Sequence, residues 1–141
     1  MQVYGIRENA VSGALIEIDY NSVFIGGVAP SGTNTTAAYR KQASNFISMR
    51  NNIFYNARTN DGGTGTGTHW AIMSNNSTYS SISNNDYFTD GVGGVLGTNT
   101  GTIAGNQTTL SAWQTAVPND VASISQNPNF VAGLKLSLIH I

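Results

Sequence analysis

The chain has 141 residues, a net charge of −1 and no cysteine, and charged residues make up only 9% of it. These features exclude disulfides and thiol catalysis and leave no electrostatic field that would attract nucleic acid. No run of about eighteen apolar residues is present, so no membrane-spanning helix is predicted. Asparagine, serine and threonine number 17, 14 and 15, and because they compete for backbone hydrogen bonds they favour short strands and turns over long helices.

Short strands are predicted wherever apolar residues alternate with small or polar ones. In chain order these segments are 3–6, 14–18, 23–25, 37–39, 46–49, 53–55, 69–73 and 95–96. Glycine-rich loops at 26–36 and 58–68 separate some of them. One short helix is predicted near the C-terminus, because Leu110, Trp113 and Val117 share a face and Pro118 stops it. Its N-cap is Ser111, in a capping box, or Thr108 or Thr109.

Asparagine recurs where one predicted strand meets the next. The corner asparagines are Asn21, Asn51, Asn84 and Asn127, and an aromatic residue follows each of them three positions later. The spacing is near thirty, with one longer interval that contains the predicted helix. Strands that return in the same direction after each repeat stack in parallel. The sequence therefore predicts an all-β, right-handed parallel β-helix of three to four coils with one short helix, and the four asparagines are expected to lie one above another.

Few residues suggest chemistry. Glu17 and Asp19 share one face of a predicted strand and are expected to lie beside Arg50 of the next coil, as a solvated ion pair rather than a catalytic site. His69 has no His, Cys or Glu partner at ligand spacing, so no metal site and no cofactor are predicted.

Two aromatic residues are candidates for carbohydrate binding. Tyr39 and Trp70 would form a platform for a sugar ring if both side chains point outward. Stacking of the same rings inside the coils is the preferred alternative, and the sequence leaves the choice open.

The ordered motifs resemble the right-handed β-helix repeats of large secreted bacterial surface proteins, within the pectate-lyase-like fold group. The segments that carry the resemblance are YNSVFIGG at 20–27, RNNIFYNAR at 50–58, HWAI at 69–72, TLSAWQ at 109–114 and PNFV at 128–131. The resemblance implies export and location outside the cell, and stacked asparagines at the second turn of each coil.

The expected function is that of a non-catalytic structural or adhesive segment of a secreted or cell-surface protein. Its expected partners are neighbouring coils of a longer chain and extracellular polysaccharide. The alternatives are a fragment of a polysaccharide lyase or glycoside hydrolase of this fold, and a carbohydrate-binding module. Residues 1–135 are expected to form the β-helix fragment. Residues 136–141 fit the translation of a sequencing adapter, CTG TCT CTT ATA CAC ATC, and are expected not to be native.

Overall fold

The structure is a computed structural model that describes residues 2–10, 13, 15–43 and 46–130. These residues form mainly short β-strands with one α-helix and two short 3-10 helices, so the predicted all-β class is confirmed. The expectation for residues 136–141 lies outside the described residues.

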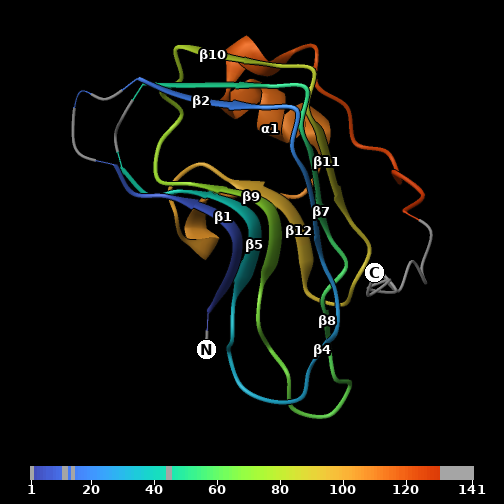
Figure 1. The fold of residues 1–141 in the computed structure, drawn as a ribbon. Coiled ribbons are helices and arrows are strands. Elements are labelled where there is room, and N and C mark those ends of the chain that lie inside the picture. The colour runs from blue at the N-terminus through green and yellow to red at the C-terminus, as the bar shows by residue number, and fades with distance from the viewer. Residues whose placement is uncertain (1, 11–12, 14, 44–45, 131–141) are drawn as a thin grey trace, which may run out of the picture.

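The longest layer, called sheet A here, has the strand order β1-β5-β9-β12-β13. Its strands are β1 (Val3–Glu8), β5 (Thr36–Lys41), β9 (His69–Ser74), β12 (Gly94–Thr98) and β13 (Asn106–Gln107). The first four strands pair in parallel, and only β13 runs antiparallel to its neighbour. Register partners such as Thr36 and His69 lie 33 positions apart in the chain. Figure 1 shows β1, β5, β9 and β12 side by side in chain order.

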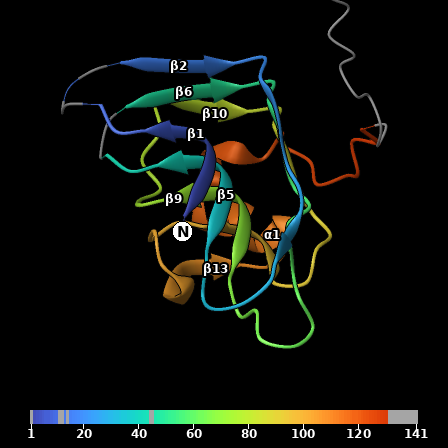
Figure 2. The same ribbon diagram turned by 60° about the horizontal axis from the view of Figure 1, so that its bottom comes forward.

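Two further parallel sheets and a strand pair complete the arrangement. Sheet B contains β2 (Ile16–Asp19), β6 (Ile47–Arg50) and β10 (Ser81–Ser83), which Figure 2 shows stacked in parallel. Sheet C contains β3 (Ser22–Ile25), β7 (Ile53–Asn56) and β11 (Asp86–Thr89), and β4 (Val28–Ala29) pairs with β8 (Thr59–Asn60). The chain thus runs through sheets A, B and C and returns to A, and one such passage is called a circuit below.

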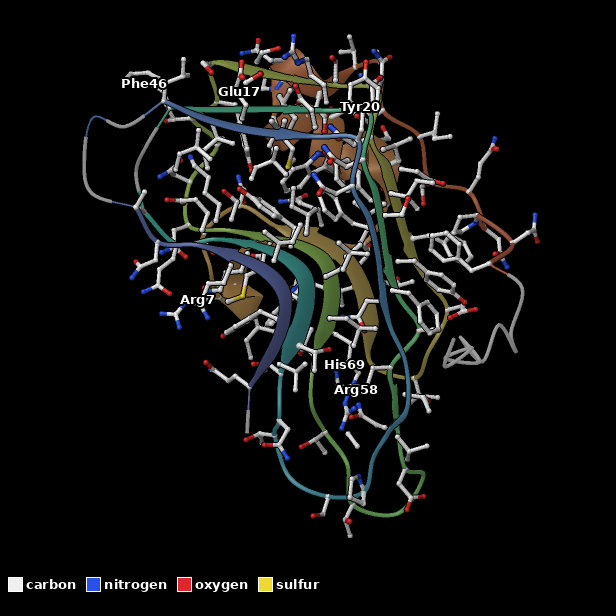
Figure 3. All side chains as sticks on the ribbon, in the orientation of Figure 1. Arg7, Glu17, Tyr20, Phe46, Arg58 and His69 are labelled. Carbon is white, nitrogen blue, oxygen red and sulfur yellow. The ribbon has the colours of Figure 1, made fainter. Side chains whose placement is uncertain are left out.

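Sharp corners join sheet B to sheet C. Tyr20, Asn51 and Asn84 have φ angles of 58°, 58° and 55°, in the left-handed region. Asparagine tolerates this region because its short amide bonds locally, and Tyr20 adopts it with its ring 80% exposed. Figure 3 shows Tyr20 at the outer edge of the corner. The predicted corners at Asn51 and Asn84 are therefore present.

Aromatic rings fill the space between the sheets. Tyr39 of β5 stacks on Phe54 of β7 with ring centroids 5.3 Å apart, and Phe54 stacks on Tyr87 of β11 at 6.2 Å. Trp113 then meets Tyr87 edge to face at 5.8 Å. All four side chains are fully buried, so they form one continuous interior column that links successive circuits.

The helix α1 (Leu110–Ala116) lies against the last circuit and carries Trp113 into the interior. Thr109 caps it, because the backbone N–H of Ala112 donates to Thr109 Oγ1 at 3.2 Å. The predicted helix is confirmed, with Thr109 as its cap. The predicted capping box at Ser111 is wrong, because Ser111 lies inside the helix. Two 3-10 helices flank α1, η1 (Ile103–Gly105) and η2 (Pro118–Asp120).

Asp120, at the end of η2, ties the helix to the last circuit. Its side chain is fully buried and accepts hydrogen bonds from Trp113 Nε1 at 2.7 Å, from Tyr87 Oη at 2.8 Å and from Ser123 Oγ. Burial raises the pKa of Asp120, and the hydrogen bonds from Ser123, Trp113 and Tyr87 oppose that rise.

The raised pKa of Asp120 predicts how stability depends on pH. Between the ordinary and the raised pKa the folded state binds more protons than the unfolded state, so the free energy of unfolding rises as the pH falls through this window. We expect the wild type to gain more stability than Asp120→Asn when the pH is lowered from about 7 to about 4. Denaturant unfolding at a series of pH values measures this difference. Parallel stability curves for the two proteins would contradict the prediction.

Candidate functional site

The corner side chains form a hydrogen-bonded ladder between circuits. Asn21 Nδ2 donates to Asn52 Oδ1 at 3.0 Å, and Asn52 Nδ2 donates to Asn85 Oδ1 at 2.9 Å. Each oxygen also accepts a backbone N–H, from Asn21 at 3.0 Å and from Asn52 at 3.1 Å. Asn52 and Asn85 are buried, so the ladder satisfies amide and backbone groups that have little access to water.

The two ends of the ladder differ. At one end the backbone N–H of Asn85 donates to Ser123 Oγ at 2.9 Å, and this hydroxyl donates in turn to Asp120. At the other end, no described residue donates to Oδ1 of Asn21. The ladder is therefore closed by Ser123 and open at Asn21.

The predicted stack is wrong by one position in two of its rungs. Asn51 and Asn84 are exposed and occupy the left-handed corner, where Tyr20 stands in the first circuit. The following residues, Asn52 and Asn85, turn inward and form the rungs. The left-handed residue faces outward at the bend, so only the next side chain reaches the interior. Asn21 alone of the predicted set is in the ladder.

Asn127 is also outside the ladder. It is exposed, and its Oδ1 accepts the backbone N–H of Asn129 at 2.8 Å in a local turn. The bridge between Asp86 and Ile124 instead places Ser123 level with the last asparagine rung. The long final interval misled the prediction, because the helix and its connections occupy that interval.

We expect the central rung to contribute most to stability. Asn52→Ala removes an acceptor for two donors and leaves buried polar groups unpaired, which should cost about 1–3 kcal/mol of unfolding free energy. Asn9→Ala, at an exposed position outside the ladder, should change stability by less than about 0.5 kcal/mol. Urea unfolding of both variants measures the contrast. Equal losses would show that the ladder makes no special contribution.

The acids of sheet B contact Arg50 as expected. Arg50 Nη2 lies 2.8 Å from Asp19 Oδ2 and 3.9 Å from Glu17 Oε1, and the Arg50 backbone N–H donates to Asp19 Oδ1 at 3.0 Å. The Arg50 and Glu17 side chains are 42% and 66% exposed. The arrangement is a solvated ion pair in which both carboxylates face the same guanidinium.

Tyr39 and Trp70 do not form an exposed platform. Tyr39 is fully buried in the interior column, and Trp70 is 2% exposed. Trp70 belongs to a separate buried cluster with Ala37 and Met73, and its Nε1 donates to Asn106 Oδ1 at 2.8 Å. Of the two arrangements that the sequence left open, the outward pair is absent. The preferred arrangement, with the rings inside, holds for Tyr39, whereas Trp70 is buried in its own cluster with Tyr4 and Val95 beside it.

A different set of aromatic residues lies on the outer face of sheet C. Phe24, Tyr55 and Phe88 are register partners on β3, β7 and β11, and neighbouring rings meet edge to face at 5.1 and 5.2 Å. Phe24 is 56% exposed. Phe130 stacks over Tyr55 at 6.1 Å and meets Phe24 at 6.2 Å. These four residues are called the outer aromatic column below.

A carboxylate borders this column. Tyr55 Oη donates to Asp90 Oδ2 at 2.7 Å, and burial, with the bond to Asp90, raises the pKa of Tyr55 to about 12. The hydroxyl therefore stays protonated at neutral pH and holds the Tyr55 ring in place. The alternation of outward and inward side chains in β3, β7 and β11 could have revealed this column. It did not, because the predicted alignment of the corner asparagines paired Phe24 with Phe54 instead of Tyr55.

His69 lies in a buried polar cluster rather than an open site. Its Nδ1 lies 3.0 Å from Thr36 Oγ1 and its Nε2 lies 3.0 Å from Asn60 Oδ1. Since the amide oxygen can only accept, Nε2 carries the proton of the neutral ring. Burial, with a smaller contribution from Arg58, lowers the pKa of His69, and Figure 3 shows Arg58 beside it.

The described residues contain no group of three or more His, Cys, Asp or Glu side chains placed to hold a metal ion. None of the helices in the described part of the chain is long and apolar enough to cross a membrane. The chain matches no family model, no curated protein and no solved structure.

Proposed function

We propose that the chain is a segment of a right-handed parallel β-helix that serves as a structural or adhesive module of a secreted or cell-surface protein. Three features support this proposal: the repeated parallel registers, the amide ladder and the interior aromatic column. In such a module each circuit contacts mainly its neighbours, so the array extends by addition of circuits.

The observation that carries the proposal is the difference between the two ends of the stack. At one end Trp113 and Asp120 cover the last circuit. At the other end β1, β2 and β3 each have one strand neighbour among the described residues, and Asn21 Oδ1 receives no hydrogen bond from them. Such an edge is a template for another strand. The proposed partner is a further circuit of a longer chain.

The backbone of β3 shows which groups this partner would meet. The carbonyl oxygen of Asn21 accepts from the Ile53 N–H at 2.8 Å, and that of Ile25 accepts from the Ala57 N–H at 2.7 Å. Successive residues of a parallel strand bond to opposite neighbours. The N–H groups of Ser22 and Phe24 therefore point toward the open edge.

We expect the isolated chain to self-associate through this edge. Ser22→Pro removes an N–H at the open edge without removing a bond to β7, so it should reduce association. Ser125→Pro, at the opposite end of the stack, is the matched control and should not. Light scattering and sedimentation velocity over a range of concentrations measure the effect. A wild-type chain that stays monomeric at high concentration would contradict the open-edge proposal.

A second candidate function is carbohydrate binding at the outer aromatic column. Aromatic rings give sugar-binding surfaces a large apolar contact, and polar groups at their border fix the orientation of the ligand. Phe24 offers an exposed ring, and Asp90 supplies a hydrogen-bond acceptor beside Tyr55. Tyr55 is 8% exposed and Phe130 stacks on it, so Phe24 is the ring that a ligand would contact.

We expect Phe24→Ala to weaken binding to neutral polysaccharides by about 0.5–1.5 kcal/mol. Phe46→Ala is the matched control, because Phe46 is 59% exposed and lies immediately before β6, away from the column. Affinity electrophoresis with a panel of polysaccharides compares the two variants with the wild type. Equal migration of all three proteins would exclude the column as a binding surface.

The same panel tests the enzymatic alternative. A polysaccharide lyase or glycoside hydrolase would release new sugar ends, and its activity would depend on carboxyl groups. Release that is abolished by Glu17→Gln would favour the enzyme over the structural module. The pairing of Glu17 and Asp19 with Arg50 instead favours a structural role for these acids.

A further inference from the structure

Lys41, the last residue of β5, is fully buried. Its register partners are Glu8 at the end of β1 and Ser74 at the end of β9, and Glu8 is 6% exposed. A buried lysine is rare unless it is paired, because the ammonium loses its hydration. The groups that contact the Lys41 amine must therefore compensate for its lost hydration.

The Lys41 amine lies against a side-chain amide of the next circuit. Nζ is 2.5 Å from Asn76 Oδ1, and it also donates to the carbonyl oxygen of Thr78. The Tyr79 ring covers it at 4.7 Å from the ring centroid. Since a carbonyl bond is about 1.2 Å long, Nζ lies within about 4 Å of the Asn76 carbonyl carbon, close to the distance for attack.

The Asn76 amide is held and polarised in this position. The backbone N–H of Thr78 donates to Asn76 Oδ1 at 3.0 Å, which identifies the oxygen and stabilises negative charge on it. The Asn76 backbone N–H contacts Ser74 Oγ at 3.4 Å, and Ser74 Oγ donates to the Asn76 carbonyl. These bonds fix the turn that follows β9.

Burial makes the neutral form of the Lys41 amine easier to reach. Burial lowers the pKa of Lys41 to about 8, and Glu8 opposes the shift. The titratable groups that act on this region within the described residues are Glu8 from β1, Tyr39 from β5 and Tyr79 from the segment after β9. A lowered pKa increases the fraction of neutral amine, which is the nucleophilic form.

We propose that Lys41 and Asn76 join in an intramolecular isopeptide bond. Lys41 Nζ forms a bond to the Asn76 carbonyl carbon, and the bond from that carbon to Nδ2 breaks. One proton passes from Nζ to Nδ2, and ammonia leaves, so the reaction needs no oxidant or other reactant. We assign the transfer of this proton to Glu8, the register partner of Lys41 on β1.

The product fits the surrounding hydrogen bonds. Nζ keeps one hydrogen, which continues to donate to Thr78, and the amide oxygen keeps its bond from the Thr78 N–H. The bond joins residues 35 positions apart, on adjacent circuits. It therefore cross-links two layers of the stack in a chain that has no cysteine for disulfides.

Mass spectrometry of the purified full chain tests this proposal. We expect the intact wild-type mass to fall short of the sequence mass by one ammonia. Tryptic digestion should yield one branched peptide that joins the segments containing Lys41 and Asn76. Lys41→Met and Asn76→Ala should have their full sequence masses and should unfold at lower temperature. Glu8→Gln should form the bond more slowly.

Asn75→Ala is the matched control, because Asn75 is the exposed neighbour of Asn76 and its amide bonds the Gln42 carbonyl instead. This variant should still lose one ammonia. The proposal is overturned if the wild-type chain keeps its full mass after prolonged incubation at about pH 8. It is equally overturned if ammonia loss persists in Asn76→Ala, since cyclisation elsewhere would then explain it.

Discussion

Each corner between sheets B and C places backbone N–H groups and a side-chain amide inside the molecule, and these polar groups need hydrogen-bond partners there. In this protein Asn52 meets that requirement in two directions, because its oxygen accepts from Asn21 and its amide donates to Asn85 and to the Ile18 and Arg50 carbonyls. Sheets B and C meet along this line of amides. The parallel registers on both sides of the corner depend on it, since a shift of one residue would exchange inward and outward side chains.

The interior aromatic column and the α1 cap build on that register. Phe54 and Tyr87 stack because β7 and β11 begin at register partners, Ile53 and Asp86, directly after the corner. Trp113 then covers the last ring, and Asp120 satisfies both the indole and the Tyr87 hydroxyl. A buried carboxylate with several donors is costly to expose or to leave unpaired, so it fixes one position for the helix. The cap is specific to this last circuit.

Much of this architecture could be predicted from alternation and repetition. The corners at Asn51 and Asn84, the parallel return of the chain and the helix with its Thr109 cap follow from local patterns, as do most of the longer strands. The short strands β4 and β8 do not, because they lie in the segments 26–36 and 58–68 that were predicted to be loops. The register could not be fixed in the same way. An Asn-Asn pair offers two candidates for the inward position. The prediction aligned Asn21 with Asn51, the first of the pair, whereas in the structure Asn21 aligns with Asn52 and Tyr20 with Asn51.

That single step also explains why the outer aromatic column was missed. It aligned Phe24 with Phe54, which is an interior residue, and so concealed the outward alignment of Phe24 with Tyr55. The hydrogen bond of the Trp70 indole depends on Asn106 in β13, a two-residue strand with no alternation to reveal it. The approach of Lys41 to Asn76 joins residues on adjacent circuits, and no local pattern encodes that distance.

The ladder also has a direction, and that direction has a consequence for synthesis. Asn21 donates to Asn52, Asn52 donates to Asn85, and the last backbone N–H of the series meets the Ser123 hydroxyl. The circuits therefore follow one another in space in the order in which the ribosome releases them. Each new circuit finds its template already made, and the residues that terminate the stack emerge last. Vectorial growth of this kind lets the nascent chain add layers before its closing helix exists.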